Sequence, residues 1–284
     1  MKLRGVRRSR NVVDQRGQRR AGRGGGGGLK VGGFGLIVIL LLGYVFGVDV
    51  TPLLQGGGGV SVQSEQRAPT PAEDRAATFA SQVLTTTEQV WAQVFPDQLG
   101  QRYSPPQLVL FSGAVQSACG GASASSGPFY CPADKRAYLD TAFFAVLEQR
   151  LGARGDFAAA YVIAHEVAHH VQTELGILGQ ANAIRAQSSQ TESNAISVRI
   201  ELQADCLSGV WASFVEGMLE PGDLDEALNA AKRIGDDYLQ RQAGQRPNPH
   251  TFTHGTSAQR QRWFERGYQA QDVQVCDTFS AARL

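Results

Sequence analysis

An uncharged run of eighteen residues, Val31 to Val48, divides this 284-residue chain into two unlike parts. In a helix this length nearly crosses the hydrocarbon core of a bilayer. The charged region before the run is thirty residues long, and no clear small-x-small cleavage site follows, so the run does not resemble a cleaved signal peptide. We therefore predict a transmembrane anchor at residues 31–48, with any folded domain on one side of it.

Charge is distributed very unevenly around the anchor. Residues 1–30 contain ten Lys or Arg and one acidic residue, a net charge of +9, whereas residues 51–284 contain seventeen basic and twenty-four acidic residues, a net charge of −7. Basic segments beside a membrane helix stay in the cytoplasm. We predict a single-pass cell-membrane protein with a basic cytoplasmic arm (residues 1–30) and an extracytoplasmic domain. The arm has no interleaved aromatic residues, so we expect no nucleic-acid partner.

A Gly-, Pro- and polar-rich segment, residues 49–71, is predicted to link the anchor to one domain of residues 72–284. The spacing of apolar residues predicts a mainly α domain with a small β-sheet (α+β). An exposed strand edge in this sheet would suit pairing with an extended peptide. The predicted helices are 73–95, 141–151, 156–175, 190–218, 222–241 and 256–268, and the predicted strands are 108–111, 129–131 and 136–139.

The chain contains four cysteines, an even number that favours disulfides in a domain outside the cytoplasm. Cys119 and Cys131 bracket a stretch rich in Gly and Ser, as the two ends of a disulfide-closed loop would. This pairing leaves Cys206 with Cys276, although the sequence alone allows three connectivities.

The most apolar predicted helix, 156–175, carries the sequence HEVAH at residues 165–169. His165 and His169 are one helical turn apart, so both rings project from one face and can meet one tetrahedral zinc ion. Glu166 lies about 100° around the helix, where it flanks the ion and can take a proton from a zinc-bound water. The alternative is a pair of structural histidines packed in a polar pocket.

A second motif, ELQAD at residues 201–205, offers the third protein ligand that a catalytic zinc site needs. Glu201 and Asp205 are also one turn apart and share a helix face. One is expected to bind the metal while the other accepts the free ring N–H of a ligand histidine. Glu201 is the preferred ligand, and Asp205 or the more distant Glu192 is the alternative. A solvated acidic face is disfavoured because apolar residues surround the pair.

The domain has three further histidines. His254 is a candidate for stabilising the negative charge that develops on a substrate oxygen during hydrolysis. Arg260 and Arg262 are alternatives for this role, and His254 would then be a loop histidine bonded to the backbone. His170 and His250 are expected to be structural.

Three motifs, HEVAHH, ELQADC and HTFTHGTSAQRQRWF, together with the N-terminal anchor, resemble the bacterial family described as "putative neutral zinc metallopeptidase". The resemblance covers roughly residues 72–276. Members of this family look like gluzincins, which are zincin-like peptidases with HExxH and a glutamate ligand in an ExxxD run. The resemblance implies one Zn²⁺ ion bound by His165, His169 and Glu201, with Glu166 as the base and Asp205 supporting a ligand. It implies no defined substrate.

These features predict a membrane-anchored zinc endopeptidase, in which Glu166 activates a water on zinc to hydrolyse a peptide or protein substrate. One alternative is a non-catalytic, zinc-stabilised envelope scaffold. Glu166 argues against it, because a structural zinc site has no use for a base. A zinc amidase acting on cell-wall peptides uses the same chemistry and stays open as a second alternative. The oligomeric state is not predicted.

Overall fold

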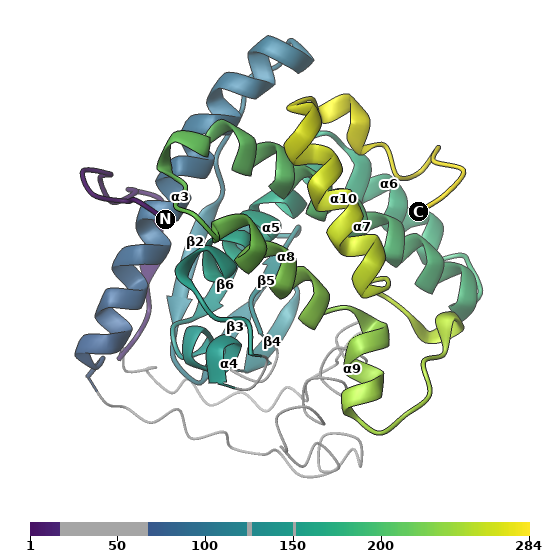
Figure 1. Ribbon diagram of the computed structural model, residues 1–284, viewed down its shortest axis with the longest axis horizontal. Helices are drawn as coiled ribbons and strands as arrows, with labels where there is room; N and C mark the ends of the chain where they lie inside the picture. Colours follow the sequence, from purple (N-terminus) through teal and green to yellow (C-terminus); the bar gives the residue numbers. More distant parts are fainter. Residues whose placement is uncertain (18–67, 124–126, 150–151) are drawn as a thin grey trace.

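The computed structural model describes residues 1–17, 68–123, 127–149 and 152–284. In this part of the chain, eight α-helices stand beside a four-stranded sheet and a two-stranded hairpin (Figure 1). The predicted α+β class is confirmed. None of the helices in the described ranges has the length and apolar character needed to cross a bilayer. The predicted anchor at residues 31–48 lies outside the described residues.

The four-stranded sheet has the order β1-β2-β6-β5 and mixes both strand directions. β1, β2 and β6 run parallel to one another, and β5 is antiparallel to β6. All three predicted strands are confirmed, as β2, β5 and β6. The sheet strands are Val12–Asp14 (β1), Gln107–Phe111 (β2), Phe129–Cys131 (β5) and Arg136–Asp140 (β6).

β2 is buried on both faces. Leu108 and Leu110 enter the main core with the helices, whereas Val109 and Phe111 enter a second cluster that includes residues of the hairpin β3 (Ala114–Ser117) and β4 (Gly120–Ser123). A strand covered on both sides needs a continuous apolar run, which is why it was recognisable in the sequence. The hairpin was not predicted, because its Gly- and Ser-rich strands carry little apolar signal.

The helices agree with the predicted ranges except at three places. The predicted helix 190–218 ends at Phe214 and is followed by the 3-10 turn Glu216–Met218. α6 was not predicted, and the predicted helix 222–241 is broken into α8 and α9 at Gly235. A Cβ at Gly235 would lie 2.5 Å from the backbone nitrogen of Ser257, so glycine allows the start of α10 to approach closely. The eight helices are Pro71–Val94 (α3), Phe143–Gln149 (α4), Asp156–Glu174 (α5), Ile177–Arg185 (α6), Gln190–Phe214 (α7), Asp223–Arg233 (α8), Asp236–Gln242 (α9) and Ser257–Ala270 (α10).

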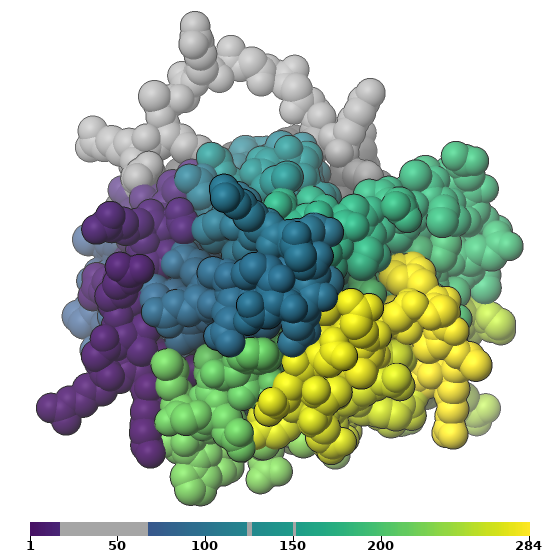
Figure 2. Space-filling model, turned by 90° about the horizontal axis from the view of Figure 1, so that it is seen from above, coloured from purple at the N-terminus to yellow at the C-terminus, as the bar shows by residue number. Residues whose placement is uncertain are grey.

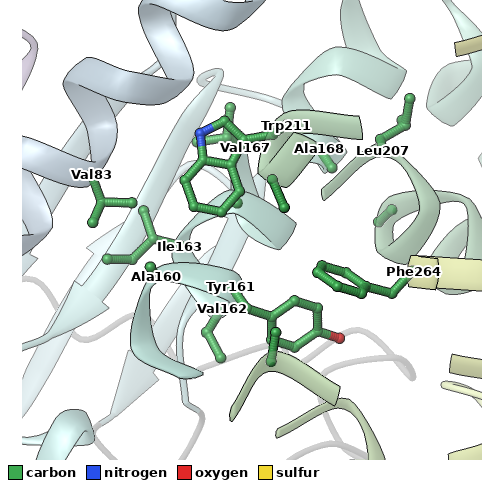
Figure 3. Close-up of a cluster of buried hydrophobic side chains, with 14 of the residues drawn as sticks. Val83, Ala160, Tyr161, Val162, Ile163, Val167, Ala168, Leu207, Trp211 and Phe264 are labelled. Atoms are coloured by element: carbon green, nitrogen blue, oxygen red, sulfur yellow. The ribbon is translucent and has the colours of Figure 1, made fainter. Parts of the chain in front are cut away.

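α5 is the central helix of the domain and is apolar on nearly every side. Figure 3 shows its side chains between Val83 of α3, Trp211 of α7 and Phe264 of α10. The Trp211 ring stacks on Phe157 with 5.7 Å between the centroids, and its Nε1 donates to the Thr86 hydroxyl at 3.1 Å. A helix packed this closely holds its polar side chains in fixed positions.

α7 and α10 cross in close contact through two glycines. A Cβ at Gly209 would lie 2.0 Å from the carbonyl oxygen of Phe264, and a Cβ at Gly267 would lie 1.9 Å from that of Cys206. Neither overlap can be relieved by rotating a side chain, because both contacts are with backbone. These glycines therefore set the distance between the two helices.

We expect Gly209→Ala to lower the free energy of unfolding by about 3 kcal/mol or more, because the helices must separate to admit the methyl group. Urea unfolding followed by circular dichroism measures this. Gly179→Ala on α6 is the matched control. A Cβ there meets no atom within 4 Å, so we expect it to be neutral or stabilising by up to about 1 kcal/mol. Equal stability of Gly209→Ala and the unmodified protein would contradict the proposed close contact.

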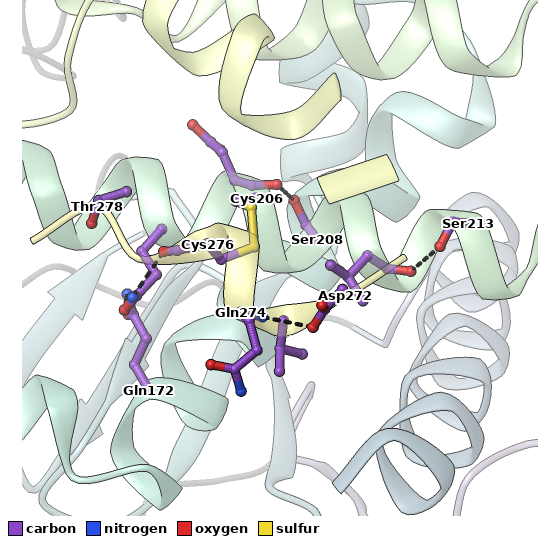
Figure 4. The surroundings of a disulfide bond; sticks show 12 residues. Gln172, Cys206, Ser208, Ser213, Asp272, Gln274, Cys276 and Thr278 are labelled. Carbon is purple, nitrogen blue, oxygen red and sulfur yellow. Dashed lines mark hydrogen bonds between the residues drawn. A yellow bond between two sulfur atoms is a disulfide. The ribbon is translucent and has the colours of Figure 1, made fainter. Parts of the chain in front are cut away.

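Both predicted disulfides are present. Cys119–Cys131 joins the start of β4 to β5, next to the edge of the sheet. Cys206–Cys276 attaches the 3-10 turn Val273–Cys276 to the middle of α7 (Figure 4). No free cysteine occurs in the described ranges.

Residues 1–17 pack against the domain, and the prediction of a separate arm over residues 1–30 does not hold for them. β1 pairs with β2. Just before and just after β1, the Leu108 N–H donates to the Asn11 carbonyl and the Gln15 N–H donates to the Leu110 carbonyl. Met1 and Leu3 are buried in the main core, while the basic residues from Lys2 to Arg10 are exposed. Figure 2 shows this segment, in purple, along the surface beside α3. The high basic content hid the apolar positions that fasten the segment.

Candidate metal centre

α5 and α7 bring the three predicted ligands to one point. His165 Nε2 lies 3.1 Å from Glu201 Oε2, and His169 Nε2 lies 3.6 Å from Glu201 Oε1. One donor atom from each of the three side chains lies within 4.8 Å of the others. Ligands bound tetrahedrally at 2.0–2.1 Å from zinc would be about 3.3 Å apart. Because the observed separations bracket this value, the residues fit one zinc ion.

The outer nitrogen of each imidazole faces a side-chain oxygen. His165 Nδ1 lies 2.9 Å from Asp205 Oδ1, and His169 Nδ1 lies 2.8 Å from Gln172 Oε1. Carboxylate and amide oxygens are acceptors, so a proton on Nδ1 of each ring would face an acceptor and leave Nε2 for a metal. This supports the fit to zinc and places Asp205 beside a ligand histidine, as predicted.

Gln172 was missed in the sequence. Its amide nitrogen donates to the Ile200 carbonyl at 2.8 Å and to Gln203 Oε1 at 3.0 Å, so the side chain that orients His169 is itself held by α7. Its position could have indicated this role, because Gln172 is a polar residue one turn after His169 on an otherwise apolar helix.

Buried carboxylates lie close to the histidines of the site, and their negative charge is stabilised by a nearby positive charge. Burial raises the pKa of Glu201, but His169, His254 and His165 outweigh it and hold that pKa well below its usual value. Burial lowers the pKa of His165, whereas Asp205 and Glu201 outweigh burial and raise it to about 9. The pocket therefore favours a bound cation, and zinc would compete with a proton on His165.

Glu166 lies beside the ligand set on α5 and is partly buried. Burial raises its pKa above the usual value, and the neighbouring His169 and His165 partly oppose this shift. A carboxylate with a raised pKa is a stronger base and returns its proton less readily to bulk water. Its position and environment are those expected of a proton carrier.

His254 is within reach of the charge of Glu201. Burial lowers its pKa, but the negative charges of Glu201 and Asp236 outweigh burial and raise that pKa above the usual value. Its Nδ1 lies 3.3 Å from Asp236 Oδ1. The other oxygen of Asp236 accepts three backbone N–H groups, from Thr253, His254 and Gly255. Asp236 was not predicted, because eighteen residues of irregular spacing separate it from His254.

Two of the sequence alternatives do not lie where their proposed roles require. Glu192 is part of the capping box of α7, where it accepts from the N–H and hydroxyl of Ser189, so it does not serve as the alternative ligand. Arg262 is exposed and contacts the carbonyl of Leu284. Arg260 is buried, with its guanidinium bonded to both oxygens of Asp205.

Of the two remaining histidines, His170 is packed as a structural residue. His170 is buried, with Nδ1 3.0 Å from the Tyr130 hydroxyl and Nε2 2.6 Å from the Ser104 carbonyl oxygen. His250 is exposed in a short 3-10 turn.

Two histidines one helical turn apart, a carboxylate base between them and a glutamate from a second helix form the constellation of zinc metallopeptidases. Comparisons with known proteins agree. A family model described as "Putative neutral zinc metallopeptidase" matches residues 1–279, and the chain belongs to this family.

Relatives with substantial identity occur in distant bacteria. The chain is 46% identical over 285 residues to "Uncharacterized protein YpfJ" of Escherichia coli, which covers 98% of this chain and 99% of that protein. It is 47% identical over 212 residues to "Uncharacterized protein Mb2605" of Mycobacterium bovis, which covers 70% and 69% of the two chains. No solved structure matches.

Proposed function

We propose that this protein is a zinc-dependent endopeptidase with Glu166 as its catalytic base. The observation that carries the proposal is the convergence of His165, His169 and Glu201 on one point, with a partly buried carboxylate beside it. A purely structural zinc site has four protein ligands, whereas this set supplies three and leaves a position for substrate.

The residues divide the reaction between them. When bound, zinc would act as a Lewis acid that polarises the scissile carbonyl and lowers the pKa of water. Glu166 takes the proton from the attacking water and later returns it to the leaving amine. His254, oriented by Asp236, donates an N–H to the oxygen on which negative charge develops.

The sheet offers a place for an extended substrate. β5 ends the order of the four-stranded sheet, so within the described residues it pairs on one side only. α5 packs against β5, and Tyr130 of this strand reaches His170 on the same helix as the predicted ligands. A peptide backbone added along this edge would run past the metal centre with its hydrogen bonds satisfied.

The test is metal analysis of the purified protein together with digestion of an unbiased peptide library. We expect one zinc ion per chain, internal cleavage, loss of cleavage on chelation and its return with zinc. Zinc without cleavage of any peptide would favour the scaffold alternative. Cleavage confined to cell-wall peptides would favour the amidase. Cleavage unaffected by complete removal of zinc would contradict the proposal.

We also propose that the domain lies outside the cytoplasm and is held at the membrane through residues 31–48. Two disulfides support an oxidising compartment. The packing of residues 1–17 on the domain argues against the cytoplasmic position expected from their charge. Because residues 1–17 pack against the domain, we place them on the same side of the membrane as the domain.

Labelling of introduced cysteines tests this topology, because the native cysteines of the described residues are in disulfides. Arg10→Cys and Arg266→Cys replace exposed residues of the N-terminal segment and of α10. In intact spheroplasts, we expect an impermeant maleimide to label both variants. Labelling of Arg266→Cys alone would mean that the N-terminus is cytoplasmic and the domain is outside. Labelling of neither variant would mean that the whole domain is in the cytoplasm.

A further inference from the structure

We propose that Arg260 and Tyr161 are positioning residues of the metal centre, which lock Asp205 and through it the ring of His165. This inference rests on the proposed metal site but not on peptide cleavage. It assigns Arg260 a role different from the contact with substrate that the sequence suggested.

Three helices meet at the Asp205 carboxylate. Arg260 of α10 binds it with a two-pronged contact, from Nε to Oδ2 at 2.9 Å and from a terminal nitrogen to Oδ1 at 2.9 Å. Tyr161 of α5 donates its hydroxyl to Oδ1 at 2.5 Å. His165 Nδ1 approaches the same oxygen at 2.9 Å. Asp205 therefore connects a ligand histidine to two other buried side chains.

The three groups are enclosed and rigid. Asp205 and Tyr161 are 0% exposed and Arg260 is 1% exposed, so no solvent competes for their hydrogen bonds. Tyr161 lies one helical turn before His165, which brings its hydroxyl to the same carboxylate oxygen from the same helix face. Figure 3 shows Phe264 beside the Tyr161 ring, and the two pack edge to face with 5.5 Å between centroids. Tyr161 is therefore held by Phe264 at its ring and by Asp205 at its hydroxyl.

This geometry leaves little freedom for a direct role of Arg260 in chemistry. Moving the guanidinium to a substrate oxygen would abandon Asp205 as an unpaired buried carboxylate, which costs several kcal/mol. The planar fork instead fixes the rotation of the Asp205 carboxylate, and a fixed carboxylate fixes the plane of the His165 ring. Ring orientation determines how well Nε2 points at the metal.

The competing interpretation is that the ion pair only holds α7 against α10. Stability alone cannot separate the two, since removing a buried partner destabilises the protein in either case. The readouts that differ are the affinity for zinc and the ligand geometry around the metal. Removing a partner that orients a ligand histidine typically weakens metal binding by about 10- to 100-fold.

The experiment compares Arg260→Lys and Tyr161→Phe with the unmodified full chain, using zinc competition against a chromophoric chelator and the visible spectrum of the Co²⁺-substituted protein. Lysine keeps the positive charge but loses the two-pronged contact. Phenylalanine keeps the ring and removes only the hydroxyl. Arg262→Lys, at an exposed position of the same helix, is the matched control. Circular dichroism confirms that each variant is folded.

We expect both variants to fold, to bind zinc about 10- to 100-fold more weakly and to show a changed Co²⁺ spectrum, while Arg262→Lys matches the unmodified protein. Unchanged zinc affinity and Co²⁺ spectrum in folded Arg260→Lys or Tyr161→Phe would overturn the proposal. If Arg260→Lys does not fold, Tyr161→Phe decides alone. An unmodified protein that binds no zinc would overturn the proposal as well. Zinc binding with the expected variant effects but without peptide cleavage would contradict only the proposed function.

Discussion

Glu166→Gln protein should retain its zinc and lose peptide cleavage, with kcat/KM lower by roughly 10²- to 10⁴-fold. Glutamine has nearly the size of glutamate, so the packing of α5 and the orientation of His165 and His169 stay intact. It cannot take the proton from water or return it to the leaving amine. Zinc content by mass spectrometry and rates on one fluorogenic peptide, chosen from the library digestion, measure the two quantities on the same samples.

Glu265→Gln makes the same chemical change at an exposed position of α10 and should leave both quantities unchanged. Undiminished cleavage by Glu166→Gln would remove Glu166 as the base. Loss of zinc from Glu166→Gln would mean that this side chain contributes to metal binding. In either case the assignment of proton transfer to Glu166 would be wrong.

The second large effect is expected from Glu201→Gln, which should weaken zinc binding by more than roughly 100-fold. That value is the upper end of the loss in affinity when a residue that only orients a metal ligand is replaced. The amide retains the shape of the side chain but removes the negative charge that faces His165 and His169 in the pocket. Equilibrium competition with a chelator measures the affinity. Cleavage at limiting zinc should fall in parallel.

Two further variants make this prediction specific. Asp205→Asn should weaken zinc binding less than Glu201→Gln, because Asp205 lies against the outer nitrogen of His165. Glu192→Gln should leave zinc binding unchanged, because Glu192 caps α7 away from the site. A larger loss in Asp205→Asn than in Glu201→Gln would support the inverse assignment, with Asp205 as the ligand.

The core of the candidate site could be predicted from local spacing. His165 and His169 share a face because any α-helix places residues four apart in one row, and Glu201 and Asp205 follow the same rule on α7. The α5 stretch is apolar on nearly all sides, which predicted a buried helix without knowledge of its neighbours. Both disulfide pairs were also within reach, since two of four cysteines bracket one short loop.

The supporting residues could not be predicted in the same way. Asp236 orients His254 and Arg260 locks Asp205, yet each pair is joined only because separate helices pack together. The break at Gly235 is likewise explained by the approach of α10 and not by a local signal strong enough to end a helix. The many basic residues in 1–30 dominated the sequence pattern, so the few apolar side chains that attach residues 1–17 to the core were not recognised.

The sequence by itself determined the helices that carry the ligands, the two histidine donors and the base beside them, and it narrowed the third donor to a few carboxylates. These depend on the 3.6-residue period of the helix and on the burial of apolar side chains, both of which are local. The tertiary structure alone decided that α5, α7 and α10 meet at Asp205, and that the N-terminal segment belongs to the domain. These contacts join residues up to 222 positions apart, so they follow only from how the elements fill the core.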